Sequence, residues 1–398
     1  MKGAIILFSI SYKAPNGASS FVHSFVGQKV FFAKYGINLS VFSRDNYQKC
    51  DFTNAEVIAR RHKIKTFIWM IIDHIPLLTI LYDYFMESRT ARKVVREFYE
   101  QNGESNVDVI HCQEDNTCYY LLKHKPTSKV IVTFHSDGSD FDMLFSSRPG
   151  FNSRIGRKYL NHRLNYILQR VDGIGFVSRS SMELFAKNHP DFCTKKLFYV
   201  YNGIPSLPLK HDYSPKERIQ FICVGSICAR KNQMALIEAI TLLPDNIKRQ
   251  MELLLVGDGP SAEEIRSYVQ THSIDNVILK GSCTNVAELL KQADVFILAS
   301  KSEGLPISII EAMREGLPII GSDVAGIPEM IEDGNSGFIT GTDAKSISES
   351  IVKMILLSDE DRKKFGQRSY SLFKEKFCIE SMLDAYADVY NKMISTKK

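Results

Sequence analysis

Two carboxylates stand in a mostly apolar stretch of the chain, SEGLPISIIEAMREGLPIIGSD at residues 302–323. A proline suits the first turn of a helix here and a glycine suits its end, so we expect Glu303 in the preceding loop and Glu311 within the helix. Buried carboxylates are costly unless they accept hydrogen bonds. We therefore expect ligand hydroxyl groups at both glutamates, and a phosphate at the N–H groups of Gly304 and Leu305.

Two cations, Arg230 and Lys231, occupy the turn VGSICARKN at residues 224–232, between an expected strand and an expected helix. A guanidinium and an ammonium at this place can clamp a diphosphate. The alternative is a pair of surface charges at a helix start. Cations are unfavourable near the positive end of a helix dipole, so an anionic ligand explains them better.

Two strand ends in the first half of the chain could also meet a ligand. His135 lies where the run TFHSDGSDFD leaves a strand, although a structural histidine remains an alternative. Gly17 lies in a turn that opens a helix and could approach a phosphate, but a plain strand-to-helix turn would look the same. Asp140 and Asp142 spell a D-x-D pattern, yet no other ligand candidates accompany them, so we expect no metal and no cofactor.

The segment VGDGPSA at residues 256–262 satisfies G-x-G-x-x-A after an expected strand. Taken alone it suggests a dinucleotide site, and an NAD-dependent oxidoreductase is therefore one alternative. The same glycines serve any tight strand-to-helix turn. No clear acidic residue ends the following strand, so the pattern is weak evidence.

The elements that must position these residues are short apolar runs separated by helix-length segments. Continuous rather than alternating runs indicate strands buried on both faces of parallel sheets. We expect an α/β protein with two doubly wound, Rossmann-like domains facing a central cleft, with ligands beyond the carboxyl ends of the strands. The runs lie at residues 4–10, 107–112, 129–136, 172–178, 219–226, 252–259, 276–282, 293–300 and 317–323.

Length and composition agree with two domains. The chain has 398 residues, 44% of them hydrophobic, and its formal charge is +5. Prolines and a glycine interrupt periodicity at residues 201–215, so we place the domains at 1–203 and 204–375, with a helix at 376–398 crossing back to the first domain. The mild positive charge suits phosphate ligands or an anionic membrane, and we expect no nucleic-acid partner.

The eight cysteines are scattered without metal-ligand spacing, which favours reduced thiols in a cytoplasmic protein. The apolar run near the N-terminus stops too soon for a signal peptide and predicts a first buried strand. Basic residues flank an aliphatic and aromatic segment at 59–96, which is interrupted too often to span a bilayer. Two interpretations stay open: helices of the domain core, or a surface element that contacts the inner face of the cell membrane.

The ordered set of motifs resembles the retaining family 4 glycosyltransferases of the GT-B fold. It comprises the E-x7-E spacing in EGLPISIIE, then SDVAGIPEMI and EDGNSGFI, the glycine turn near Gly17, His135, the NGI at residues 202–204, the VGS…RKN segment and VGDGP. The resemblance implies a UDP- or GDP-linked sugar donor held mainly by the second domain. It implies a glycan or lipid-linked acceptor held mainly by the first, in the synthesis of surface polysaccharide or glycoconjugates.

By motif position, Glu311 should contact the ribose hydroxyls, Glu303 the donor sugar near the reacting carbon, and His135 the same sugar. The backbone of Gly281, Ser282 and Cys283 should border the base.

The family's usual arginine falls on Ser226, so Arg230 would have to replace its charge, with Lys231 beside it. The family's second glycine after Gly17 is Ala18 here. The resemblance implies retention at the anomeric carbon without a metal, the leaving group itself taking the acceptor proton. An epimerase or hydrolase of the same fold and a non-catalytic binding subunit are the further alternatives.

Overall fold

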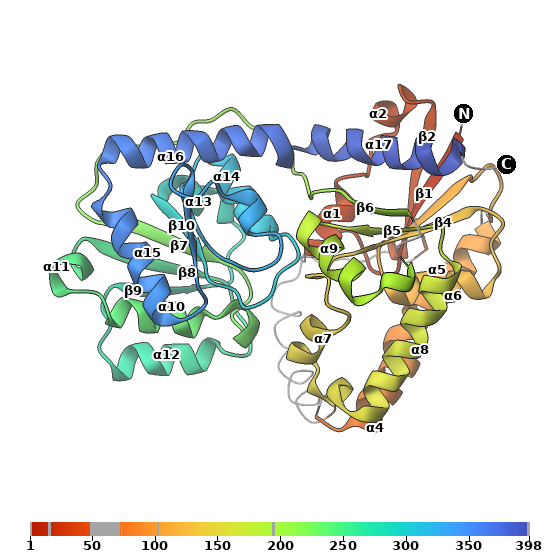
Figure 1. Ribbon diagram of the computed structural model, residues 1–398, viewed down its shortest axis with the longest axis horizontal. Helices are drawn as coiled ribbons and strands as arrows, with labels where there is room; N and C mark the ends of the chain where they lie inside the picture. Colours follow the sequence, from red (N-terminus) through yellow and green to blue (C-terminus); the bar gives the residue numbers. More distant parts are fainter. Residues whose placement is uncertain are drawn as a thin grey trace. The chain divides into compact units, whose positions relative to one another are not determined.

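The computed structural model describes residues 2–14, 17–47, 72, 74–101, 103–192 and 196–395. Contacts divide the chain into two units, each built on its own sheet (Figure 1). Unit 1 is Met1–Tyr201 with Met382–Lys398, and unit 2 is Asn202–Ser381. Both sheets are parallel and have six strands, so the expected pair of doubly wound α/β domains is confirmed.

The sheet of unit 1 has the strand order β2-β1-β3-β4-β5-β6. Among its central strands, β3 and β5 are buried along their whole length, and β1 is buried except at Lys2, because most of their residues are apolar on both faces. The strands are β1 (Lys2–Phe8), β2 (Ile37–Ser43), β3 (Val109–Cys112), β4 (Lys129–Phe134), β5 (Gly173–Phe176) and β6 (Lys196–Tyr199).

Two helical layers cover this sheet (Figure 1). One face carries α5, α6 and α8, and the other carries α1 and the C-terminal helix α17. Ala91, Val94, Val95 and Phe98 of α5 follow helical spacing and are buried against the sheet. The helices are α1 (Gly17–His23), α2 (Lys29–Ala33), α4 (Pro76–Tyr82), α5 (Ser88–Gln101), α6 (Asp115–Lys123), α7 (Asp142–Ser147), α8 (Arg154–Arg170), α9 (Arg179–Asn188) and α17 (Ile379–Ser395).

Helix α17 belongs to both units in sequence, since it begins in unit 2 and Met382 onward groups with unit 1. Its Tyr386 and Tyr390 are fully buried there. The Tyr386 ring lies 5.4 Å from that of Phe25, and the hydroxyl of Tyr390 lies 2.8 Å from Nδ1 of His111 on β3. The last helix therefore completes the core of the first unit.

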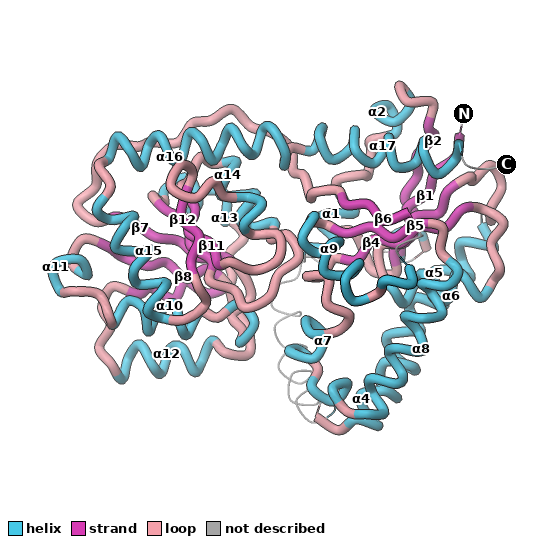
Figure 2. Tube along the Cα trace, viewed as in Figure 1, coloured by secondary structure: helices cyan, strands magenta, loops and turns pink. Residues whose placement is uncertain are grey.

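The sheet of unit 2 has the order β12-β11-β10-β7-β8-β9. Helices α10, α12 and α15 cover one face, and α13, α14 and α16 cover the other (Figure 2). The strands are β7 (Ile219–Val224), β8 (Met251–Val256), β9 (Val277–Gly281), β10 (Val295–Leu298), β11 (Ile319–Ser322) and β12 (Gly337–Thr340). The helices are α10 (Gln233–Thr241), α11 (Asp245–Lys248), α12 (Ala262–Thr271), α13 (Val286–Gln292), α14 (Ile307–Arg314), α15 (Ala344–Leu356) and α16 (Asp359–Leu372).

Every apolar run expected to form a strand does so, but β2, β6 and β12 were missed. All three lie at a sheet edge, each with a single strand neighbour. Strand β2 shows the reason, because its burial partly alternates along INLSVFS instead of being continuous. A search for continuous apolar runs therefore found every central strand and the edge strand β9, but it overlooked the other three edges.

Candidate functional site

The centre of the candidate site in unit 2 is Glu303, which is 6% exposed. Its Oε1 lies 2.6 Å from Nζ of Lys231 and 3.0 Å from Nη1 of Arg230. Neither contact has the direction of a hydrogen bond, so Oε1 is a buried oxygen without an aligned donor among the described residues. A buried carboxylate paired with two cations that still have donors to offer suits a polar ligand.

The loops after β7 and β10 bring these residues together. Nη1 of Arg230 donates to the carbonyl of Ser302 at 2.7 Å, and the amide of Lys301 donates to the carbonyl of Arg230 at 2.8 Å. Asn232 is left-handed, at φ 60°, and its Nδ2 donates to the carbonyls of Ala299 and Thr342 at 3.0 and 2.7 Å. The RKN segment is therefore attached to the segment that carries Glu303.

The glycines of VGS and VGDG have a packing role. A Cβ on Gly257 would lie 1.9 Å from the carbonyl oxygen of Gly225, and a Cβ on Gly259 would lie 2.3 Å from that of Ile227. Gly225 also has φ 152°, and a Cβ there would face the end of the Lys231 side chain at 3.6 Å. Close contact between the turns after β7 and β8 thus explains the G-x-G pattern without a dinucleotide.

Glu311 lies on α14 and is half-buried. Burial raises the pKa of its carboxyl, and Arg314 opposes that rise. The carboxylate accepts no hydrogen bond from the described residues, and the amides of Gly304 and Leu305 donate none within the same part of the chain. Glu311 is the fifth residue of α14, and Gly304 and Leu305 precede the helix. A ligand at these groups stays a prediction.

The three residues expected near the base follow β9. Gly281 is left-handed, at φ 75°, and its carbonyl accepts from the amide of Gly257 at 2.9 Å. The Sγ of half-buried Cys283 lies 3.6 Å from the same oxygen, and Ser282 is exposed. These contacts connect the loop to the VGDG turn, whereas no hydrogen bond or ion pair joins it to Glu303 or Glu311 among the described residues.

His135 lies in unit 1, directly after β4, and is half-buried. Its Nε2 lies 3.0 Å from Oε1 of Gln113, and Nε2 of Gln113 lies 3.0 Å from Nε2 of His111. Burial lowers the pKa of His135 to about 4, so the ring is neutral at pH 7. Because an amide oxygen can only accept, Nε2 of His135 carries the proton and Nδ1 is an acceptor.

Gly17 is the first residue of α1, and residues 15 and 16 of its turn lie outside the described part of the chain. The turn is held by the Oγ of Ser19, which donates to the carbonyl of Ser11 at 2.9 Å. In the D-x-D segment, Oδ1 of Asp140 lies 2.5 Å from Nε2 of His189. Asp140 therefore already has a partner within the protein.

Sequence reasoning missed Gln113 and the structural role of Asn232. Gln113 directly follows the buried strand β3, and that position was the available signal. Asn232 stood in the quoted RKN, and asparagine is among the few residues that adopt a left-handed conformation readily.

Each of the two units matches the model of a known glycosyltransferase family. Residues 32–206 match the model for glycosyltransferase family 4, and residues 210–372 match the model for glycosyl transferases group 1. A Bacillus anthracis N-acetyl-α-D-glucosaminyl L-malate synthase is 27% identical over 333 residues, covering 80% of this chain and 81% of that protein.

A second relative is the Escherichia coli UDP-Gal:α-D-GlcNAc-diphosphoundecaprenol α-1,3-galactosyltransferase, 26% identical over 76% of this chain and 85% of its own. The crystal structure of Anabaena HepE with UDP and glucose aligns with a TM-score of 0.67 at 15% identity, over 98% of this chain and 99% of that one. The fold and the two family matches together place this chain among the family 4 glycosyltransferases of the GT-B fold.

Proposed function

We propose that the protein transfers a sugar, with retention at the anomeric carbon, from a nucleotide-diphosphate sugar to a glycan or lipid-linked acceptor of surface polysaccharide or glycoconjugate synthesis. The observation that carries the proposal is the buried Glu303, whose Oε1 lies beside two cations without an aligned hydrogen bond. The E-x7-E pair then acts as one unit, with Glu303 at the donor sugar and Glu311 at the ribose hydroxyls.

In this proposal Arg230 and Lys231 serve the diphosphate as well as Glu303. An ammonium has three donors, so Lys231 can keep its contact with Glu303 while donating to a phosphate oxygen. The open amides of Gly304 and Leu305 add donors at the start of α14. Bond breaking leaves negative charge on the diphosphate, and these groups stabilise it. Because two cations already face this position, we propose that the reaction needs no metal.

Glu303 would orient the sugar and favour the positive charge that develops at its anomeric carbon. The departing phosphate oxygen would take the proton of the acceptor hydroxyl on the same face, which preserves the configuration. His135 would accept a hydrogen bond from a sugar hydroxyl through Nδ1, because its Nε2 proton is directed to Gln113.

For the donor we propose a UDP-sugar ahead of a GDP-sugar. The Anabaena structure contains UDP, and the name of the E. coli relative specifies UDP-Gal. That same name specifies a diphosphoundecaprenol acceptor, which supports a lipid-linked acceptor here. We propose unit 2 as the donor-binding part and unit 1 as the acceptor-binding part. The protein would act in the cytoplasm, at the inner face of the cell membrane.

The missing family arginine at Ser226 raised the alternative of a non-catalytic subunit. The contact between Arg230 and Glu303 supports an active enzyme, because Arg230 supplies a guanidinium at this site. An epimerase or hydrolase would share the donor site, and product analysis without acceptor separates those reactions from transfer.

The first experiment is thermal unfolding of the purified protein with UDP, GDP, ADP, CMP or NAD. A ligand at about 100 times its dissociation constant adds roughly 2.7 kcal/mol to the free energy of unfolding. We expect UDP to stabilise the wild type and the stabilisation to shrink in Glu311→Ala. Glu315→Ala is the control, because Glu315 is buried but pairs with Arg314 at 3.1 Å. Stabilisation by NAD alone would refute the proposal, and NMR of the product would establish the anomeric configuration.

A further inference from the structure

Helix α4 and the π-helical turn after it, Asp83–Glu87, have an inverted distribution of polarity. Within PLLTILYDYFME, the fully buried side chains are those of Thr79 and Asp83. The apolar side chains face outward, with exposed fractions of 60% for Leu77, 41% for Leu81 and 57% for Phe85. A surface helix of a water-soluble domain normally buries its apolar face and exposes its polar one.

The buried side of this segment is a network of charges. Asp83, 2% exposed, accepts a hydrogen bond from Tyr159 at 2.7 Å and one from Nη1 of Arg163 at 3.1 Å. Buried Arg148 lies 3.9 Å from the same carboxylate and 2.6 Å from Glu87. Charges paired inside a helical layer, with apolar side chains outside, are the arrangement expected where the outside is hydrocarbon.

These apolar residues are concentrated at one end of unit 1. Half of the exposed large apolar side chains in the described part of the chain are here, seven of them in residues 75–86 and the eighth at Ile155 on α8. Helix α4 packs against α8 and the turn Pro149–Asn152. Figure 1 shows α4 at the end of α8 that is farther from the sheet. We call residues 75–86 with Ile155 the apolar tip.

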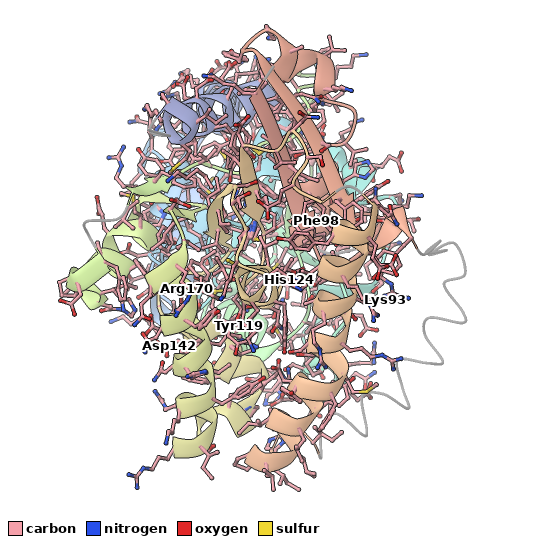
Figure 3. All side chains as sticks on the ribbon, turned by 90° about the vertical axis from the view of Figure 1, so that its right-hand side faces the viewer. Lys93, Phe98, Tyr119, His124, Asp142 and Arg170 are labelled. Carbon is pink, nitrogen blue, oxygen red and sulfur yellow. The ribbon has the colours of Figure 1, made fainter. Side chains whose placement is uncertain are left out.

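Basic residues follow the apolar tip on both sides. Arg89, Lys93 and Arg96 are exposed on α5 at positions i, i+4 and i+7, which lie on one face of the helix. Figure 3 shows Lys93 on the outer side of α5, with Phe98 turned to the core. On α8, Arg154 and Arg157 are exposed next to Ile155. Apolar residues bordered by cations complement an anionic lipid surface in both polarity and charge.

We propose that the apolar tip inserts into the interfacial layer of an anionic bilayer, with the basic residues of α5 and α8 at the lipid headgroups. The contact is interfacial, since no helix in the described residues is long and apolar enough to cross a membrane. The proposed membrane contact names the surface that would present a lipid-linked acceptor to the enzyme. Only this link to the acceptor rests on the proposed function. Residues 59–71 and 73 of the expected segment 59–96 lie outside the described part of the chain.

The test is sedimentation of the full-length protein with vesicles of phosphatidylcholine alone or of an equimolar mixture with phosphatidylglycerol. We expect binding to the anionic vesicles that weakens with salt. The double variant Leu77→Ser/Leu81→Ser should lower vesicle affinity about tenfold or more, because two exposed leucines no longer enter the bilayer. Leu242→Ser/Leu356→Ser is the control, since those leucines are 58% and 69% exposed but lie in unit 2.

All four leucines are exposed, so both double variants should unfold at the wild-type temperature. Equal vesicle binding by the two double variants, or no binding by the wild type, would refute the proposal. A wild-type dimer that dissociates in Leu77→Ser/Leu81→Ser would also refute it, by assigning the tip to a second copy. Stabilisation by UDP reports separately on the proposed function and should persist in both variants, so a failure of either hypothesis can be recognised.

Discussion

Replacing Glu303 with glutamine tests the site most directly. The change keeps the shape of the side chain and removes its charge beside Arg230 and Lys231, 3.0 and 2.6 Å away. If Glu303 favours positive charge on the sugar in the transition state, turnover should fall by about 10²–10³, or roughly 3–4 kcal/mol. The affinity for UDP should change the opposite way, because both cations lose a carboxylate that competes with the diphosphate for them.

We expect UDP to bind about three- to tenfold more tightly to Glu303→Gln, which corresponds to roughly 1 kcal/mol. Calorimetric titration gives the affinity for UDP, and turnover is measured with a UDP-sugar and acceptor. The matched control is Glu315→Gln, since Glu315 is 7% exposed against 6% for Glu303 and also lies beside an arginine. That variant should keep wild-type turnover.

The reasoning fails if Glu303→Gln weakens UDP binding while turnover at saturating donor is unchanged. Glu303 would then hold the nucleotide and would not act on the sugar. Equal losses of turnover in the glutamine variants of Glu303 and Glu315 would point to a general loss of structure. Thermal unfolding of both variants identifies that case.

Three further predictions concern the loops and the histidine. Gly257→Ala should destabilise the protein by more than about 2 kcal/mol and weaken UDP binding, since its Cβ would lie 1.9 Å from the Gly225 carbonyl oxygen. A Cβ at Gly281 would meet nothing within 4 Å, so Gly281→Ala should cost only about 1 kcal/mol, for its positive φ. Urea unfolding of the two variants makes the comparison. Asn232→Ala removes two hydrogen bonds and places alanine in a left-handed conformation that asparagine tolerates better, so we expect about 2–3 kcal/mol of destabilisation. Asn232→Gly loses the same hydrogen bonds without the strain and should be destabilised less. Similar values for both variants would show that backbone strain is unimportant. The pKa of His135 is about 4 in the folded protein and 6.5 ordinarily, so the unfolded chain binds the proton first as pH drops, and the free energy of unfolding should fall between about pH 6.5 and 4. In urea titrations at several pH values, His135→Asn should flatten part of this pH dependence. An unchanged pH dependence would contradict a buried neutral ring.

The sequence alone determined the central strands and the polar residues that follow them. Continuous apolar runs can be read without knowing the fold, because a strand covered on both faces has no polar side. The same rule placed Glu303, Arg230 and His135 at strand ends, where the carboxyl edge of a parallel sheet holds ligands. The edge strand β9 was found in this way, but the edge strands β2, β6 and β12 were not.

The tertiary structure decided which of these residues have partners. Glu303 meets Arg230 and Lys231 because β7 and β10 are neighbours in the sheet, and this order is not contained in the spacing along the chain. The proton of His135 is placed by Gln113, which comes from another strand end. The residues 75–86 are apolar at nearly every position, so their pattern indicates no preferred face. The ion pair between Asp83 and Arg163 determines that the charged side of this segment is buried and its leucines are exposed. A buried charge requires a partner, whereas a leucine does not.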